Sequence, residues 1–292
     1  GSELVLGVSA QFVQEGLGGV VEDPFGAGMC LVLVGLFFAY KLYKKNLITI
    51  GDYYRLRFGR TVEILCSIII IFSYLGWVAA QVAALGLVFN LLTQGAMSIT
   101  AGMVLGTLIV LIYTLYGGMW SVAMTQTANF FVFMVMFAVA IYAIAINPGF
   151  DAVATLLTTD AKYGNLTSVG LQTILAWFGT FLINVLLAQA AFQMALSCKT
   201  ADEGRKGLLI AGSFNVIFIA MGVLVGAAAA IAMPGNARGL VAVPKYLMET
   251  LPAPMVGLFT LGIWACALGW GAPCQFSGAT SLGRDVGSAI WP

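Results

Sequence analysis

Long stretches without any charged residue dominate the pattern of polar and apolar positions along the chain. No charged residue occurs from position 64 to position 150, and further uncharged stretches cover residues 163–198, 207–237 and 250–283. A helix needs about 20 mostly apolar residues to cross the hydrocarbon core of a lipid bilayer. These stretches therefore predict membrane-spanning helices.

Turn signals divide the longest uncharged stretch, which would be far longer than a bilayer is thick if it formed one helix. Thr93-Gln94-Gly95 and Tyr116-Gly117-Gly118 both have the composition of turns. An additional, shorter helical element is expected at residues 4–20, ending in the glycine-rich stretch 16–19. With these breaks, the pattern predicts seven spans at residues 26–43, 62–92, 97–117, 119–147, 170–197, 207–233 and 254–284.

The uncharged stretches are too long for the strands of a membrane barrel, which have about ten residues in strict alternation. We therefore expect an all-α membrane protein, with about seven transmembrane spans and an N-terminal half-helix.

Basic residues are concentrated in one connector between these spans. Residues 41–60 contain Lys41, Lys44, Lys45, Arg55, Arg57 and Arg60, of thirteen lysines and arginines in the chain. Basic residues favour the cytoplasmic side of a membrane. With this connector inside, the others alternate: the inner ones are 117–118, 198–206 and the end of the last span, and the outer ones are 93–96, 148–169 and 234–253. We therefore expect a protein of the cytoplasmic (inner) membrane, with residues 41–60 and 198–206 facing the cytoplasm.

Composition narrows the class of protein further. The chain is 61% hydrophobic and 9% charged and has no histidine, whereas an average soluble domain is about 25% charged. A net charge of +1 gives no basis for nucleic-acid binding. Four of the five cysteines fall inside predicted helices, where we expect small buried apolar residues rather than disulfides or a metal cluster: Cys30, Cys66, Cys266 and Cys274. No nucleophile, base and acid constellation is visible, so we expect neither an enzyme nor an organic cofactor.

Polar side chains near the N-terminus form the first candidate site. Glu3 precedes an apolar stretch, and Gln11, Gln14 and Glu15 follow at helical spacing. A half-helix with a carboxylate near its broken end suits a cation or a cationic substrate. The alternative is a frayed terminus without a role in binding.

A second candidate site lies in the predicted span 62–92. Tyr74, Trp77 and Gln81, next to Ser73, are spaced three and four residues apart, so they share one helix face. Aromatic rings beside an amide can stack on and orient a small polar ligand. The alternative is an ordinary packing stripe.

A third candidate site lies in the predicted span 170–197, where Thr180 and Asn184, and then Gln189 and Gln193, are four residues apart. Polar groups inside spans cost free energy in lipid, so they usually face a bundle interior or a water path. The alternative is that they bond their own helix or a neighbouring one.

Proline interrupts the last predicted span. Pro273 removes one helical hydrogen bond and so frees a backbone carbonyl one turn earlier, around Gly269. Freed carbonyls in membrane helices can be ligands for alkali ions. The alternative is a structural kink.

Several stretches together resemble the sodium/solute symporter family, which includes sodium-coupled glucose, proline and choline carriers. They are GSELVLG at 1–7, NLITIGDYYRLRFGR at 46–60, LYGGMWSVAMTQTANFF at 115–131, AQAAFQMALSCKTADEGRKG at 188–207 and SGATSLGRD at 277–285. The most specific is Tyr-Gly-Gly-x-x-Ser-Val at 116–122. The resemblance covers essentially the whole chain, with the stretches in the family's order.

The resemblance implies a partial LeuT-type inverted-repeat helical bundle. On that scheme residues 1–292 are a single transporter domain. Residues 1–147 form the first repeat, which starts inside core helix one, and residues 170–292 form a second repeat that lacks helices nine and ten. The implied function is sodium-coupled symport of a small organic solute by alternating access. The alternatives are the same fold with altered or no sodium coupling, and a sensor or scaffold that no longer transports.

The resemblance also assigns roles to residues. Glu3 matches a carboxylate near the family's substrate, and an acidic Glu3 with aromatic neighbours favours a cationic or zwitterionic solute. Asn184 stands where sugar carriers have a gating aromatic residue. Gln189 and Gln193 match family amides, although Ala188 and Met194 replace the usual asparagine and arginine. The residues expected to contact the solute are thus Glu3, Tyr74, Trp77, Gln81, Thr180, Asn184, Gln189 and Gln193.

The resemblance also implies a sodium site, and the residues at its expected positions in this chain differ from the family pattern. Its paired hydroxyls fall at Gly269 and Trp270, so the expected sodium position is defined by these residues and Cys266. A register shift towards Ser277 and Thr280 is the alternative. Gln126, after Thr125, replaces an aspartate that the resemblance links to ion release.

Overall fold

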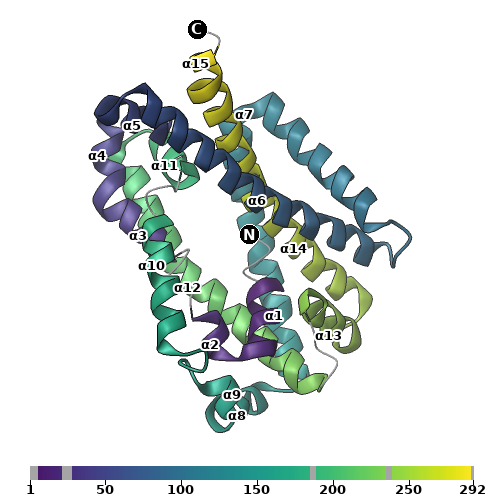
Figure 1. Cartoon of the computed structure of the whole chain (residues 1–292). Helices are drawn as coiled ribbons and strands as arrows, with labels where there is room; N and C mark the ends of the chain where they lie inside the picture. Colours follow the sequence, from purple (N-terminus) through teal and green to yellow (C-terminus); the bar gives the residue numbers. More distant parts are fainter. Residues whose placement is uncertain (1–5, 22–27, 185–188, 235–238, 291–292) are drawn as a thin grey trace.

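The computed structural model describes residues 6–21, 28–184, 189–234 and 239–290 of the chain. Within these ranges every regular element is a helix, and none is a strand (Figure 1). The prediction of an all-α protein from the uncharged stretches is therefore confirmed. The elements are α1 (Leu6–Glu15), α2 (Leu17–Val20), α3 (Cys30–Leu33), η3 (Val34–Ala39), α4 (Tyr40–Tyr43), α5 (Ile50–Phe58), α6 (Arg60–Leu92), α7 (Ile99–Ile146), α8 (Phe150–Thr159), α9 (Ala161–Gly164), α10 (Leu171–Asn184), α11 (Gln189–Leu196), α12 (Ala201–Ala232), η5 (Gly239–Val241), α13 (Ala242–Thr250), α14 (Ala253–Thr280), η6 (Ser281–Gly287) and α15 (Ser288–Ile290).

Four helical segments are long and apolar enough to cross a membrane. They are Arg60–Leu92, Ile99–Ile146, Ala201–Ala232 and Ala253–Ile290. Shorter apolar helices occupy Cys30–Tyr43, Phe150–Thr159 and Leu171–Phe181. Length and composition thus support four spans among the described residues, whereas the count of seven and the inverted repeat remain predictions.

Helix α7 contains the turn that the sequence placed between two predicted spans. Gly118 lies inside α7 with φ 53° and ψ −142°, which is not a helical conformation and which favours glycine. The helix therefore has two arms that meet at a sharp bend, as the Tyr116-Gly117-Gly118 signal predicted. Helix α1 ends at Glu15, next to the predicted glycine-rich stretch, and Gly16 (φ 73°) separates it from the short helix α2.

Three of the predicted connectors contain helices of their own. Helix α5 lies within residues 41–60, α8 and α9 lie within 148–169, and η5 and α13 lie within 234–253. The sequence analysis predicted no helices in the last two, because short helices with interspersed polar residues lack the long uncharged signature of a span.

Segments predicted to share one side of the membrane lie at the same end of the molecule. Figure 1 shows α4, α5 and α15, from predicted inner segments, near one end, and α8, α9 and α13, from two predicted outer connectors, towards the other. This arrangement agrees with the alternation of inner and outer connectors.

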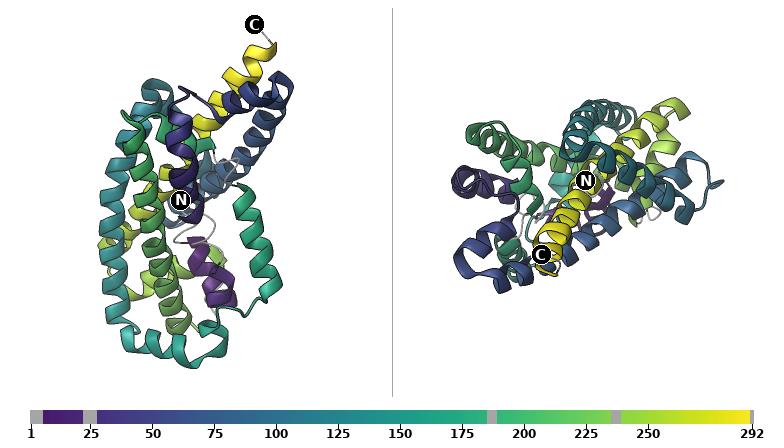
Figure 2. Two further views of the ribbon diagram at one scale, coloured as in Figure 1. Left: turned by 90° about the vertical axis from the view of Figure 1, so that its left-hand side faces the viewer. Right: turned by 90° about the horizontal axis from the view of Figure 1, so that it is seen from above.

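Helix α1 is buried against α12, deep inside the bundle. The Ser9 hydroxyl donates a hydrogen bond to the carbonyl oxygen of Gly222, at 2.7 Å. A Cβ at Gly226 would lie only 3.0 Å from the Ser9 carbonyl oxygen, so a glycine permits the close approach of the two backbones. The second arm of α7 runs beside α12 (Figure 2), and Phe137 packs on Phe218 with ring centroids 5.0 Å apart.

Candidate functional site

Helix α11 is fixed to α5 and α6 through its first residues. The side-chain Oε1 of Gln189 accepts a hydrogen bond from the backbone N–H of Ile50 at 2.7 Å. The backbone N–H of Ala190 donates to the hydroxyl oxygen of Tyr74 at 2.6 Å. The side chains of Gln189 and Tyr74 are both buried. Two residues predicted as solute contacts, Tyr74 and Gln189, are therefore brought together at the start of α11.

Gln193 connects the same helix to α14. Its Oε1 accepts a hydrogen bond from the Ser277 hydroxyl at 2.6 Å, and its Nε2 donates to the Thr280 hydroxyl at 3.3 Å. Ser277 and Thr280, considered above as alternative sodium ligands, thus have a protein partner. Gln189 differs, because its buried Nε2 has no hydrogen-bond partner among the described residues.

The face of α6 that carries Tyr74, Trp77 and Gln81 packs towards α14. The rings of Trp77 and Trp270 meet edge to face, with centroids 6.2 Å apart. Gln81 is buried, and a Cβ at Gly271 would lie 3.5 Å from its Cβ. The three residues share one face, as their spacing predicted, and this face also packs one helix against another.

A groove of about 680 Å³ lies between α6, the bend of α7 and α14. Its lining is mainly apolar and includes Tyr74, Val78, Thr114 and Gly118. Tyr74 is the one predicted solute contact in this lining, so the groove does not coincide with the predicted site.

The remaining predicted contacts do not join this group. Thr180 is exposed and donates to the Ala176 carbonyl oxygen of its own helix at 2.9 Å. Asn184 ends α10. Glu3 lies outside the described residues. Gln14 and Glu15 are exposed on α1.

The predicted sodium position offers few free oxygen atoms. Pro273 has no N–H to donate to the Gly269 carbonyl, and that carbonyl instead accepts a short hydrogen bond from Nε2 of Gln126. Cys266 is buried in an apolar cluster, and Trp270 packs on Trp77. An engaged carbonyl, a thiol and an indole do not make a complete sodium site, since hard cations are bound by several oxygen ligands.

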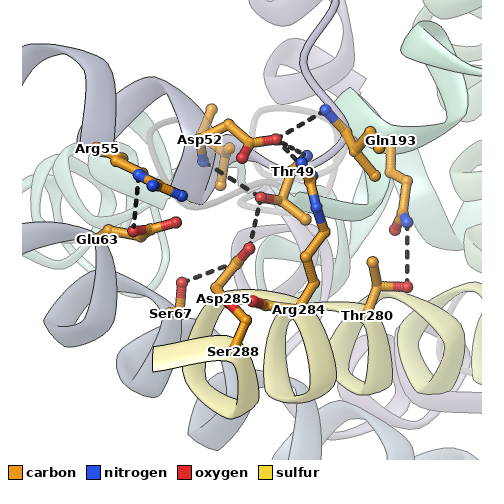
Figure 3. Close-up of polar contacts among 12 residues, drawn as sticks. Thr49, Asp52, Arg55, Glu63, Ser67, Gln193, Thr280, Arg284, Asp285 and Ser288 are labelled. Carbon is orange, nitrogen blue, oxygen red and sulfur yellow. Dashed lines mark hydrogen bonds and ion pairs between the residues drawn. The ribbon is translucent and has the colours of Figure 1, made fainter. Parts of the chain in front are cut away.

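A second group of polar side chains, which the sequence analysis did not identify, lies at the end of the molecule that carries α5 (Figure 3). The group, here called the polar cluster, consists of Thr49, Asp52, Glu63, Ser67, Arg284 and Asp285. Carboxylate oxygens of its three acidic residues lie within 4.8 Å of one another.

Asp285 is the centre of the polar cluster. It is 1% exposed, and its two carboxylate oxygens accept hydrogen bonds from the hydroxyls of Thr49 (2.9 Å) and Ser67 (3.0 Å). A Cβ at Gly51 would lie 2.6 Å from Oδ2 of Asp285, so a glycine is needed where α5 crosses η6.

Arginines balance the other two carboxylates of the cluster. The Arg284 guanidinium contacts Asp52 at 2.6 Å. Oε2 of Glu63, which is 2% exposed, lies 3.5 Å from Arg60 and 3.8 Å from Arg55. The cluster thus joins the start of α6, the start of α5 and the end of η6.

The local sequence does contain a signal for part of this cluster. Thr49 and Asp52 form a capping box, in which the Thr49 hydroxyl accepts from the N–H of Asp52 and the Asp52 carboxylate accepts from the N–H of Thr49. The Thr-x-x-Asp spacing in the basic connector predicts such a helix start. Nothing local links it to Asp285.

We expect the ionised carboxylate of Asp52 to stabilise the folded chain, so that the free energy of unfolding falls at acidic pH. Burial opposes ionisation, but the N–H groups of Ile48 and Thr49 and the Arg284 guanidinium lower the pKa of Asp52 below its ordinary 3.8. Because the folded state then binds fewer protons than the unfolded state, this contribution is present above the unfolded pKa and is lost as the pH falls through the folded one. The melting temperature, followed by tryptophan fluorescence, should start to fall below about pH 5 and continue to fall as the pH approaches the lowered pKa of Asp52.

The matched variants separate Asp52 from other acidic groups. Asp52→Asn should show a smaller fall over the same range, whereas Asp151→Asn, an exposed change on α8, should behave like the parent chain. Equal falls in all three proteins would show that Asp52 does not contribute.

The sodium:solute symporter family model matches residues 1–282. The High affinity choline transporter 1 of Homo sapiens is 30% identical over 217 residues, which are 70% of this chain and 36% of the relative. The High-affinity choline transporter 1 of Torpedo marmorata is 26% identical over 283 residues, covering 89% of this chain and 47% of the relative. The Uncharacterized symporter YidK of Escherichia coli (strain K12) is 25% identical over 285 residues, covering 88% and 48%.

The chain spans less than half the length of these relatives. The names of these relatives describe transporters and a symporter, in agreement with the expectation that the chain is not an enzyme. Because the family match extends over nearly every residue, the chain belongs to the sodium:solute symporter family.

Proposed function

We propose that this chain takes part in sodium-coupled symport of a small cationic organic solute across a cytoplasmic membrane. The observation that carries the proposal is the family match over residues 1–282. The names of the choline transporters favour a solute with a quaternary ammonium group. Alternating access would expose the solute site first to one side of the membrane and then to the other.

An aromatic pair supports the choice of a cationic solute. Trp77 and Trp270 are each partly exposed and meet edge to face. Aromatic faces attract quaternary ammonium groups, and tryptophan does so most strongly. We place the ammonium of the solute against this pair.

An amide on α11 provides a polar contact for the other end of the solute. Nε2 of Gln189 is buried and has no hydrogen-bond partner among the described residues, which is costly unless a ligand accepts from it. We assign Gln189 to a hydroxyl or carbonyl oxygen of the solute. Tyr74 and Gln193 position α11, and Gln81 is a further proposed contact. Glu3, Thr180 and Asn184 stay solute contacts predicted from the sequence alone.

Uptake of radiolabelled choline into proteoliposomes tests the proposal. We expect uptake to rise when an inward sodium gradient replaces an equal potassium gradient. Trp77→Leu should raise the KM for choline about five- to tenfold, because a desolvated cation–π contact is lost. Trp120→Leu is the matched control, since Trp120 is 76% exposed on α7.

The outcomes distinguish the candidate functions. Absence of binding and of uptake under both gradients would contradict the proposal. A KM change of equal size in Trp120→Leu would contradict the role of Trp77. Binding without uptake would leave the sensor or scaffold function.

Uptake that is indifferent to sodium is a second candidate function. It is favoured by the Gly269 carbonyl, which is engaged by Gln126 rather than free for an ion. Equal uptake under the sodium and potassium gradients would identify it.

A further inference from the structure

Exposed basic side chains gather at the end of the molecule formed by α4, α5 and the start of α12. They share one property: none has a carboxylate within 4.0 Å in the part of the chain that the structure describes. This set, here called the basic surface, consists of Lys41, Lys44, Lys45, Arg57 and Lys199.

One side chain ties two parts of this surface together. The Tyr43 hydroxyl lies 3.0 Å from the Cys198 carbonyl oxygen and 2.8 Å from the Lys199 carbonyl oxygen, and donates to them. Lys199 is thereby held beside the last turn of α4, which carries Lys41 and precedes Lys44. The charges therefore come from separate segments that the fold brings together.

The acidic residues near this surface do not neutralise it. Asp52 pairs with Arg284, Glu63 with Arg55 and Arg60, and Asp202 with Lys206 at 2.8 Å. Glu203 has no basic partner within 4.0 Å among the described residues. Its single negative charge offsets one of the five positive charges of the basic surface, so the local balance stays positive.

Large apolar side chains are exposed among these charges. Leu56 is 69% exposed and Phe58 57% exposed on α5, and Ile48 is 51% exposed just before it. The Arg57 guanidinium carbon lies 5.7 Å from the centroid of the Phe58 ring. A short helix with exposed arginines and apolar residues is typical of the boundary between lipid headgroups and acyl chains.

The neighbouring helices place this surface at headgroup depth. It follows the end of the apolar helix Cys30–Tyr43 and precedes the start of the candidate span Arg60–Leu92. Topology alone accounts for basic residues on the cytoplasmic side, but it does not account for apolar side chains exposed between them. A soluble acidic partner would leave Leu56 and Phe58 without apolar contacts.

We propose that the basic surface binds an anionic phospholipid, with the headgroup phosphate at Lys41, Lys44, Lys45 and Lys199 and the acyl region beside Leu56 and Phe58. Clusters of four to eight basic residues next to a membrane helix are typical of such sites. The site shares no residue with the proposed solute contacts, so it stands whether or not the chain transports choline.

Lipid-dependent melting of the purified full chain in detergent tests the proposal. We expect phosphatidylglycerol to raise the melting temperature, and phosphatidylcholine to have a smaller effect at the same concentration. Native mass spectrometry should show at least twofold more phosphatidylglycerol retained than phosphatidylcholine. In Lys44→Gln/Lys45→Gln, the phosphatidylglycerol concentration that gives half of the shift should rise at least fivefold.

Two further variants separate this site from general attraction of lipid to charge. Lys162→Gln/Lys245→Gln removes two exposed lysines from the opposite end and should keep the parent response, each variant being compared with its own melting temperature without lipid. Phe58→Ser should weaken retention of the intact lipid but not of soluble glycerol phosphate.

The proposal is overturned if Lys44→Gln/Lys45→Gln responds like the parent chain, or if the control pair loses the response equally. It is also overturned if inorganic phosphate or a polyglutamate peptide, at matched ionic strength, produces the whole shift. A full shift with inorganic phosphate would assign the surface to free phosphate, and a full shift with polyglutamate would assign it to an acidic protein.

Discussion

Asp285→Ala should melt at a much lower temperature than the parent chain. Asp285 is almost fully buried, and both of its carboxylate oxygens accept hydrogen bonds from buried hydroxyls. The substitution leaves the hydroxyls of Thr49 and Ser67 without this acceptor and opens a cavity where three elements meet. A buried polar group that loses its hydrogen-bond partner costs about 1–3 kcal/mol, and two hydroxyls lose theirs here, so we expect a loss of about 3 kcal/mol in the free energy of unfolding.

Thermal unfolding in detergent, followed by tryptophan fluorescence, measures this effect. Asp151→Ala is the matched control, because Asp151 is exposed in the first turn of α8 and should change the melting temperature little. A melting temperature for Asp285→Ala within the range of this control would show that the polar cluster does not hold α5 and α6 to η6.

The hydrogen bond between Gln126 and Gly269 should depend on the proline one turn further along α14. In Gln126→Leu the Gly269 carbonyl oxygen loses the N–H group that donates to it. Pro273 has no N–H that could replace this donor. We expect a loss of about 1–2 kcal/mol in the free energy of unfolding. In the Pro273→Ala background residue 273 regains an N–H, which can bond the Gly269 carbonyl, so the same Gln126→Leu change should cost much less.

A double-mutant cycle of the parent chain, both single variants and the double variant measures this coupling. We expect the interaction energy to be about 1 kcal/mol. Equal costs of Gln126→Leu in the two backgrounds would show that the side chain does not replace the hydrogen bond removed by Pro273.

The long helices were predictable because each carries its own signal. An uncharged stretch long enough to cross a bilayer identifies a span without any tertiary information. The Gly117-Gly118 pair predicts the bend, because the backbone conformation at Gly118 is one that favours glycine. Helices α8 and α13 were not predictable in this way. They are short and contain polar residues, so their helical structure depends on packing against the bundle.

The candidate site was predictable only in part. Tyr74, Gln189 and Gln193 were identified because polar side chains stand out in apolar spans, but the sequence did not show that each would find a partner within the protein. The polar cluster was missed because Thr49 and Asp285 are 236 residues apart. No local pattern indicates a contact over that distance.

This separation has a consequence for synthesis in the cell. A ribosome adds about 5–20 residues per second, so roughly 10–50 s pass between the emergence of Thr49 and that of Asp285. Throughout that time the buried hydroxyls of Thr49 and Ser67 have no carboxylate to receive their hydrogen bonds. The start of α6 is therefore made before the carboxylate of Asp285 that later contacts it. The hydrogen bonds that join α5 and α6 to η6 form only after residue 285 has been synthesised.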